Sequence, residues 1–152
     1  MPSCFFIGHR ETDAALLPKI KAAAERLIKQ RQVSDFYVGM YGNFDRLAGE
    51  AVIQLKRDYS GVRLFLVLPY HPADRPIEAP PGYDGTFYPD GMEAVSRRYA
   101  IVKANRTMIV TCDWLIAHVT HTVSNAHNLF DYALRRQKKG LIHVVNLGDG
   151  EG

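Results

Sequence analysis

A glycine, an imidazole and a guanidinium follow the first apolar run of the chain. The run CFFI ends at Gly8, and His9 and Arg10 come directly after it. Glycine lets a backbone turn or approach a ligand closely, arginine pairs with a phosphate through two hydrogen bonds, and histidine exchanges a proton near neutral pH. The three residues therefore form a candidate anion site. The alternative is a tight turn, with Arg10 in solvent or paired with Glu11 or Asp13.

Two glycines mark the next strand-to-helix link. In VGMYGNFD, Gly39 and Gly42 flank Tyr41, and Asp45 follows at the start of a helical pattern. Backbone N–H groups at a helix start can face an anion, so these four residues are a candidate second wall of the site. The segment has neither the GxGxxG nor the GK[ST] pattern. Asp45 has a second interpretation, a carboxylate that only complements the helix dipole.

Two further candidates follow the third apolar run. Tyr70 either stacks on a base or packs at the edge of the core. Arg97 belongs to a basic helical segment, where it either faces the ligand or lies in solvent. Glu93 precedes Arg97 by four residues, a spacing that supports a surface ion pair.

The last candidates are Thr120, Ser124 and Asn125, which lead into a helix that begins near residue 126. The free N–H groups of that helix start would meet a phosphate. The alternative for Ser124 or Asn125 is a helix N-cap.

No metal site is predicted. His118, His121 and His127 are spaced H-x2-H-x5-H without a nearby carboxylate or cysteine pattern. Cys4 and Cys112 lie far apart in apolar segments and are interpreted as small buried hydrophobes in a reducing compartment.

The elements that must position these residues alternate between strand and helix. The pattern predicts an α/β, doubly wound, mainly parallel sheet of about five strands with helices on both faces. Ligands of such sheets bind beyond the carboxyl ends of the strands. Segment 107–113 either continues the preceding helix or returns irregularly to the sheet, and we favour the return. Strands are expected over 3–8, 35–40, 63–70, 114–119 and 141–147, and helices from near Pro18, around 47–55, over 92–106 and over 125–138.

Segment 71–91 has no periodicity and contains five prolines and three glycines. A loop of that length in a compact domain is usually functional. It is either a lid or a contact surface.

The length of 152 residues predicts one domain over residues 1–152. The net charge of +3 is a weak signal for nucleic acid, so we expect no nucleic-acid partner. Neither a signal peptide nor an apolar run of about 20 residues is present. These features predict a cytoplasmic protein with no membrane association.

Four stretches in this order resemble the SLOG superfamily, in particular its DUF1273/YpsA-like branch, which is related to the DprA/Smf and LOG (Lonely Guy) proteins. They are FFIGHRE, YVGMYGNFDRLAGEAVIQLK, LFLVLPY and ANRTMIVTCDWLIAHV. The resemblance spans about residues 3–147 and implies a Rossmann-like fold that binds a nucleotide-type ligand. LOG enzymes cleave the N-glycosidic bond of nucleoside 5′-monophosphates with a PGGxGTxxE motif. The matching region here, HTVSNAHNLFD, lacks the double glycine.

Three functions are therefore considered. The first is a nucleotide-binding or nucleotide-derivative-binding sensor or regulatory module that requires no other cofactor. The second is a nucleoside 5′-monophosphate N-glycosidase, in which Asp45, Glu93 and His9 are acid–base candidates. The third is a regulatory protein-interaction module. By analogy with the fold, a homo-oligomer, namely a dimer, is expected.

Overall fold

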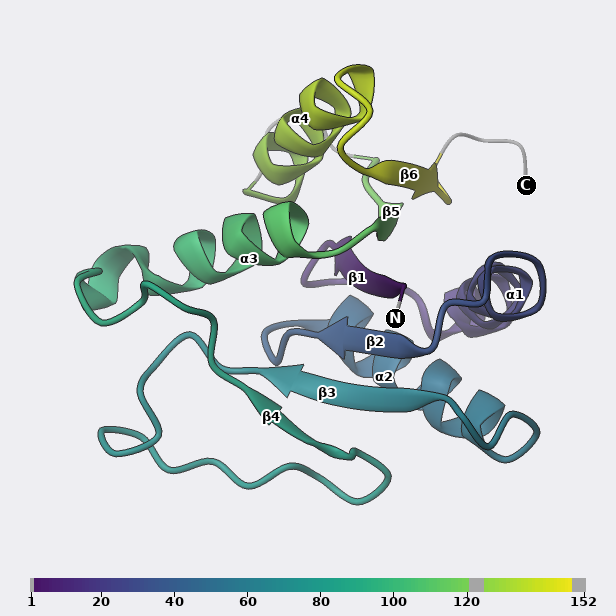
Figure 1. The fold of residues 1–152 in the computed structure, drawn as a ribbon, viewed down its shortest axis with the longest axis horizontal. Helices are drawn as coiled ribbons and strands as arrows, with labels where there is room; N and C mark the ends of the chain where they lie inside the picture. Colours follow the sequence, from purple (N-terminus) through teal and green to yellow (C-terminus); the bar gives the residue numbers. More distant parts are fainter. Residues whose placement is uncertain (1, 121–124, 149–152) are drawn as a thin grey trace.

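The computed structural model describes residues 2–120 and 125–148, in which strands and helices alternate (Figure 1). The strands are β1 (Ser3–Gly8), β2 (Asp35–Val38), β3 (Arg63–Val67), β4 (Gly85–Phe87), β5 (Trp114–His118) and β6 (His143–Asn146). The helices are α1 (Leu17–Arg31), α2 (Asn43–Lys56), α3 (Ala100–Thr111) and α4 (Asn125–Lys138), with 3-10 turns η1 (Ala14–Leu16) and η2 (Arg97–Tyr99).

The strands form one parallel sheet in the order β4-β3-β2-β1-β5-β6. The chain runs outward from β1 to β4 and then returns to the other side of β1. The strand order therefore reverses between β1 and β5, the kind of position where open parallel sheets form a ligand crevice. Gly8 pairs with His118 in the register of these two strands, so their following loops border the switch point. The predicted doubly wound α/β fold is confirmed.

Helices cover both faces of the sheet (Figure 1). Along β1, Cys4 and Phe6 belong to the core that α1 and α2 cover, whereas Phe5 and Ile7 belong to the core that α3 and α4 cover. All four side chains are buried. A strand covered on both faces has no polar alternation, which explains the continuous apolar run at the start of the sequence.

The two cysteines are free and buried, as predicted. Cys4 and Cys112 belong to different cores. Burial raises the pKa of Cys4, and it raises the pKa of Cys112 to about 12. Both thiols are therefore protonated packing groups without nucleophilic character.

The proline-rich segment 71–91 contains a strand that its sequence does not predict. The Asp84 N–H donates to the Leu64 carbonyl at 2.8 Å, just ahead of β4. Lys56 of α2 binds both the Gly82 carbonyl and the Asp84 carboxylate, each at 2.7 Å. The sheet therefore has six strands in the described chain instead of about five. Tertiary contacts pair a segment that is too short to show strand periodicity.

The helix predicted over 92–106 is displaced toward the C-terminus. The α-helix begins at Ala100, after a 3-10 turn, and ends at Thr111. Met108 and Ile109 are fully buried, and this burial explains why helical structure continues into segment 107–113. The irregular return favoured from sequence is wrong for most of that segment.

The start of the first helix follows the prediction. The Asp13 carboxylate accepts a hydrogen bond from the Ala15 N–H at 2.9 Å and caps the 3-10 turn. Helix α1 begins at Leu17 with Pro18 in its first turn, where the missing N–H of proline costs no helical hydrogen bond.

Within residues 2–120 and 125–148, no helix has the length and apolarity needed to cross a membrane.

Candidate functional site

The glycine that ends β1 makes room for an aromatic ring of α2. A Cβ on Gly8 would lie 2.2 Å from Cγ of Phe44. Phe44 is buried, and its ring stacks with His118 at 6.4 Å between centroids. The absence of a side chain at Gly8 is thus required for packing of α2 against the end of the strand. Contact of Gly8 with a ligand stays a prediction.

His9 joins the ends of β1 and β5. It is buried, with 8% of its surface exposed. Its Nε2 accepts a hydrogen bond from the Thr120 N–H at 2.9 Å, and its carbonyl accepts one from the Thr12 hydroxyl at 2.9 Å. An accepting Nε2 assigns the proton of the neutral ring to Nδ1. His9 therefore fixes the two loops that border the switch point.

Arg10 is exposed directly beyond β1. Its guanidinium forms no ion pair with any carboxylate of the described residues, which leaves the predicted alternative of a pair with Glu11 or Asp13 without support. Its carbonyl accepts a hydrogen bond from the Asn43 N–H at 2.8 Å. The backbone of Arg10 is held while its charge remains available.

Gly42 brings the second loop against the first. It has φ +124°, and a Cβ there would lie 2.9 Å from Cα of Arg10. Both features exclude other L residues at low energy. Gly42 is also the N-cap of α2, and no side chain caps that helix start. Arg10 and Gly42 therefore lie side by side, and their contact with a ligand stays a prediction.

Asp45 lies in the first turn of α2, over Gly39. Its Oδ2 accepts a hydrogen bond from the Tyr41 N–H at 3.2 Å, and a Cβ on Gly39 would lie 2.8 Å from that oxygen. Burial raises the pKa of Asp45 to about 7, against the effect of the Tyr41 hydrogen bond. The carboxyl group thus exists in both protonation states near neutral pH, as acid–base groups at functional sites often do.

Asp45 also stands close to the segment before β4. Burial and then the charge of Asp45 raise the pKa of Tyr83. The Tyr83 hydroxyl lies over α2, where a Cβ on Gly49 would be 2.1 Å from it. Helix α2 therefore contacts the switch-point loops with its first turn and the β3–β4 connection with its side.

Tyr70 carries two guanidinium groups against its ring. Cζ of Arg75 lies 5.1 Å from the ring centroid, and Cζ of Arg97 lies 5.4 Å from it. Neither arginine forms an ion pair with a carboxylate in the part of the chain that the structure describes. Tyr70 and Arg97, predicted separately, are thus brought together beyond β3, and Arg75 joins them.

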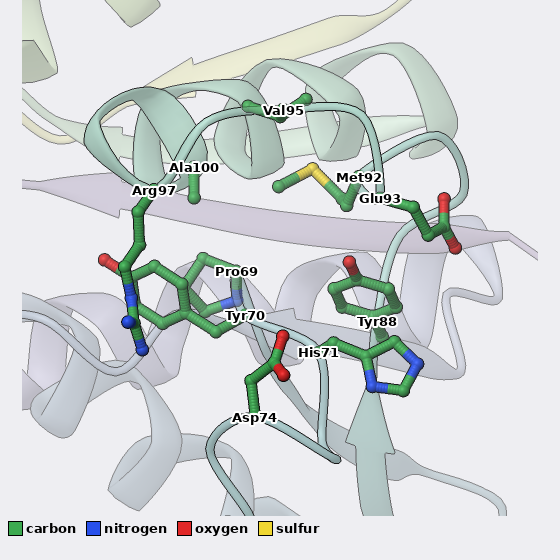
Figure 2. A pocket seen from close by; sticks show the side chains of 10 residues that line it. All are labelled: Pro69, Tyr70, His71, Asp74, Tyr88, Met92, Glu93, Val95, Arg97 and Ala100. Atoms are coloured by element: carbon green, nitrogen blue, oxygen red, sulfur yellow. The ribbon is translucent and has the colours of Figure 1, made fainter.

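Tyr70 and Arg97 line one end of a cavity of about 330 Å³ between the end of β3 and the segment that leads into α3. Figure 2 shows Arg97 beside Tyr70, with the Glu93 carboxylate on the opposite side of the cavity. The lining is Pro69, Tyr70, His71, Asp74, Tyr88, Met92, Glu93, Val95, Arg97 and Ala100. The surface pair expected between Glu93 and Arg97 does not form.

The candidate residues before α4 that the structure describes do not line the cavity of Tyr70 and Arg97. Ser124 lies outside the described residues. Thr120 is exposed, and its N–H is bound to His9. Asn125 lines another cavity, of about 360 Å³, together with Arg106 and Tyr132. The structure therefore does not place Asn125 in the cavity of Tyr70 and Arg97.

Of the three histidines, His121 lies outside the described residues. His118 is half-buried, and burial followed by the charge of Lys19 lowers its pKa. His127 lies 3.3 Å from the Asp131 carboxylate. Among residues 2–120 and 125–148, no group of three histidine, cysteine or acidic residues is arranged to hold a metal ion.

Arg75 is the residue that sequence reasoning missed. It stands between two prolines in the aperiodic segment, Pro76 and the earlier Pro72, and no periodic pattern indicates its direction. Its position depends on the turn in which the Arg75 N–H donates to the His71 carbonyl at 3.0 Å. The only sequence signal for Arg75 is that it is a basic residue close behind a predicted strand.

Comparison with known proteins shows a likeness of fold. No family model matches the chain, and no curated protein matches its sequence. The X-ray structure of DNA processing protein A (DprA) from Streptococcus pneumoniae matches with a TM-score of 0.65 and 14% identity. The match covers 95% of this chain and 50% of that chain, so the chain spans half the length of the solved protein. The protein therefore shares a Rossmann-like fold with the matching half of that structure.

Proposed function

We propose that this protein binds a nucleotide or a nucleotide derivative at the carboxyl edge of its sheet, as a ligand sensor or regulatory module of the DUF1273/YpsA-like type. The observation that carries the proposal is the position of Arg10. Its exposed guanidinium has no carboxylate partner in the described chain and follows β1 at the switch point. A phosphate group supplies the bidentate partner that arginine favours.

The start of α2 supports the same placement. Gly42 leaves the helix without a side-chain cap. The Asn43 N–H is bound to the Arg10 carbonyl, and the following N–H groups of the first turn are those that an anion would meet. Asp45 would repel that anion when ionised. Because burial raises the pKa of Asp45 to about 7, a large fraction of the carboxyl is neutral at physiological pH, and the repulsion is correspondingly reduced.

Replacement of Arg10 by alanine tests the proposal. Loss of hydrogen bonds to a charged group typically removes about 1.5–3 kcal/mol, which is roughly 10- to 100-fold in affinity. We expect AMP to bind the wild type more tightly than adenosine in calorimetric titration, and Arg10→Ala to weaken AMP binding by that factor. Arg57→Ala, at an exposed arginine after α2, is the matched control. If Arg10→Ala binds AMP as tightly as the wild type does, the proposal is wrong.

A second candidate function is hydrolysis of the N-glycosidic bond of a nucleoside 5′-monophosphate. The raised pKa of Asp45, about 7, favours it, because a general acid or base acts best with a pKa near the working pH. We expect free base from AMP with the wild type and none with Asp45→Asn, followed by chromatography. If the wild-type protein binds AMP but releases no base, the hydrolase function is rejected and only the sensor function remains.

A further inference from the structure

The cavity beyond β3 has a positively charged end, formed at Tyr70 and Arg97, and no carboxylate of the described residues pairs with it. Arg75 and Arg97 both stand against the Tyr70 ring, at 5.1 and 5.4 Å from its centroid. Two like charges held against one ring repel each other, and a bound anion would relieve that repulsion. No carboxylate of the described residues fills this role.

A hydroxyl donor stands beside the same arginine. The Tyr41 hydroxyl is buried and has no hydrogen-bond partner at acceptable geometry in the described chain. Burial and then Tyr70 raise the pKa of Tyr41, and the Arg75 guanidinium lowers it through hydrogen bonding and through its charge, so the three side chains are close neighbours. A buried hydroxyl favours a hydrogen-bond partner, and the Arg75 guanidinium is the group nearest at hand for Tyr41. The two side chains place further polar groups beside this end of the cavity.

The other end of the cavity is negative. Glu93 lies across the cavity from Arg97, and Asp74, His71 and Tyr88 line the cavity between them (Figure 2). The His71 and Tyr88 rings meet edge to face at 5.4 Å between centroids. The Glu93 and Asp74 carboxylates can accept hydrogen bonds from sugar hydroxyls, as acidic residues do in ribose recognition, and the charge of Glu93 disfavours a second anion at its end.

We propose that the cavity at the carboxyl end of β3 binds a sugar phosphate, with its phosphoryl group at Arg97 and Tyr70 and its hydroxyls at Glu93 and Asp74. The volume of about 330 Å³ is near the lower limit of small-molecule sites and suits a ligand of this size. Met92 and Val95 supply an apolar wall. Arg75 reinforces the positive end from beside the cavity.

The site adds a second ligand position to the proposed function and does not depend on it. The nucleotide position rests on Arg10 beyond β1, whereas this cavity lies beyond β3. The two positions can therefore fail separately.

The test is calorimetric titration with ribose 5-phosphate, ribose and inorganic phosphate. We expect ribose 5-phosphate to bind the wild type, ribose to bind more weakly, and Arg97→Gln to reduce the affinity by roughly tenfold or more. Arg75→Gln should produce a smaller loss. Arg57→Gln is the control and should change nothing. Thermal melts of each variant check that the fold is retained, which is expected because all three arginines are exposed.

Glu93→Gln separates a sugar phosphate from a simple anion. We expect it to weaken ribose 5-phosphate and not inorganic phosphate. Equal affinities of the wild type for ribose 5-phosphate and inorganic phosphate would overturn the sugar assignment. Absence of ribose 5-phosphate binding, or binding that Arg97→Gln leaves unchanged, would overturn the site. Loss of ribose 5-phosphate binding in Arg10→Ala alone would move that ligand to the switch point and overturn this assignment.

Discussion

Replacing Gly8 by alanine is expected to destabilise the protein by about 2–3 kcal/mol, the upper part of the range for an overpacked core position. The added Cβ would lie 2.2 Å from Cγ of the buried Phe44 ring. That ring cannot withdraw easily, because it also stacks with His118. Chemical denaturation of Gly8→Ala and the wild type measures the difference directly.

Gly61→Ala is the matched control for this substitution. A Cβ on Gly61 would meet no atom within 4 Å, and its φ lies outside the left-handed region. We expect a change within about 1 kcal/mol, with stabilisation favoured because alanine restricts the unfolded chain. A double-mutant cycle with Phe44→Leu should show coupling. Equal stabilities of Gly8→Ala and Gly61→Ala would disprove the packing role of Gly8.

The second large effect is a dependence of stability on pH that originates in Asp45. Its pKa is about 7 in the folded protein, compared with 3.8 for a free side chain. Between these values the folded state holds a proton that the unfolded state has released, so stability is fully present below about pH 4 and is lost as pH rises through 7. At 1.36 kcal/mol per pKa unit, the full loss is about 4 kcal/mol.

Asp45→Asn should remove this dependence. Asparagine keeps a carbonyl oxygen that can accept the Tyr41 N–H, and it does not titrate. We expect the free energy of unfolding of the wild type, relative to Asp45→Asn, to fall by about 2–3 kcal/mol between pH 5 and pH 8. Asp58→Asn, at an exposed carboxylate, serves as the control and should titrate like the wild type. If the free energy of unfolding depends on pH in the same way for the wild type and Asp45→Asn, Asp45 is not the source of the pH dependence.

The periodicity of apolar residues predicts those strands and helices of this fold that are long enough for the pattern to repeat. The run from Cys4 to Ile7 identifies a strand covered on both faces because every side chain in it must be apolar. The helix start near Pro18 follows from a local rule about the proline N–H. These signals lie within a few residues of the features they predict.

The remaining features depend on contacts between distant segments. β4 has three residues, and its position requires Lys56 and the β3 edge. The role of Gly8 depends on Phe44, and the placement of Arg75 on Tyr70 depends on a turn within an aperiodic segment. Sequence placed Tyr70, Arg97 and the β2–α2 loop at one edge of the sheet. It did not show that Asn125 faces another cavity, because that depends on the angle between helices.

The hydrogen bond from the Thr120 N–H to His9 joins residues 111 positions apart in the chain. β1 is also one of the two middle strands of the sheet, and its partner β5 comes from the last third of the sequence. Long-range pairing of this kind forms slowly, because the entropy of closing the intervening loop is lost before the contact is gained. During synthesis, β1, α1 and β2 leave the ribosome well before β5. The switch point is therefore completed only after most of the chain has emerged, and the ligand proposed to bind there would stabilise the protein only at that late stage.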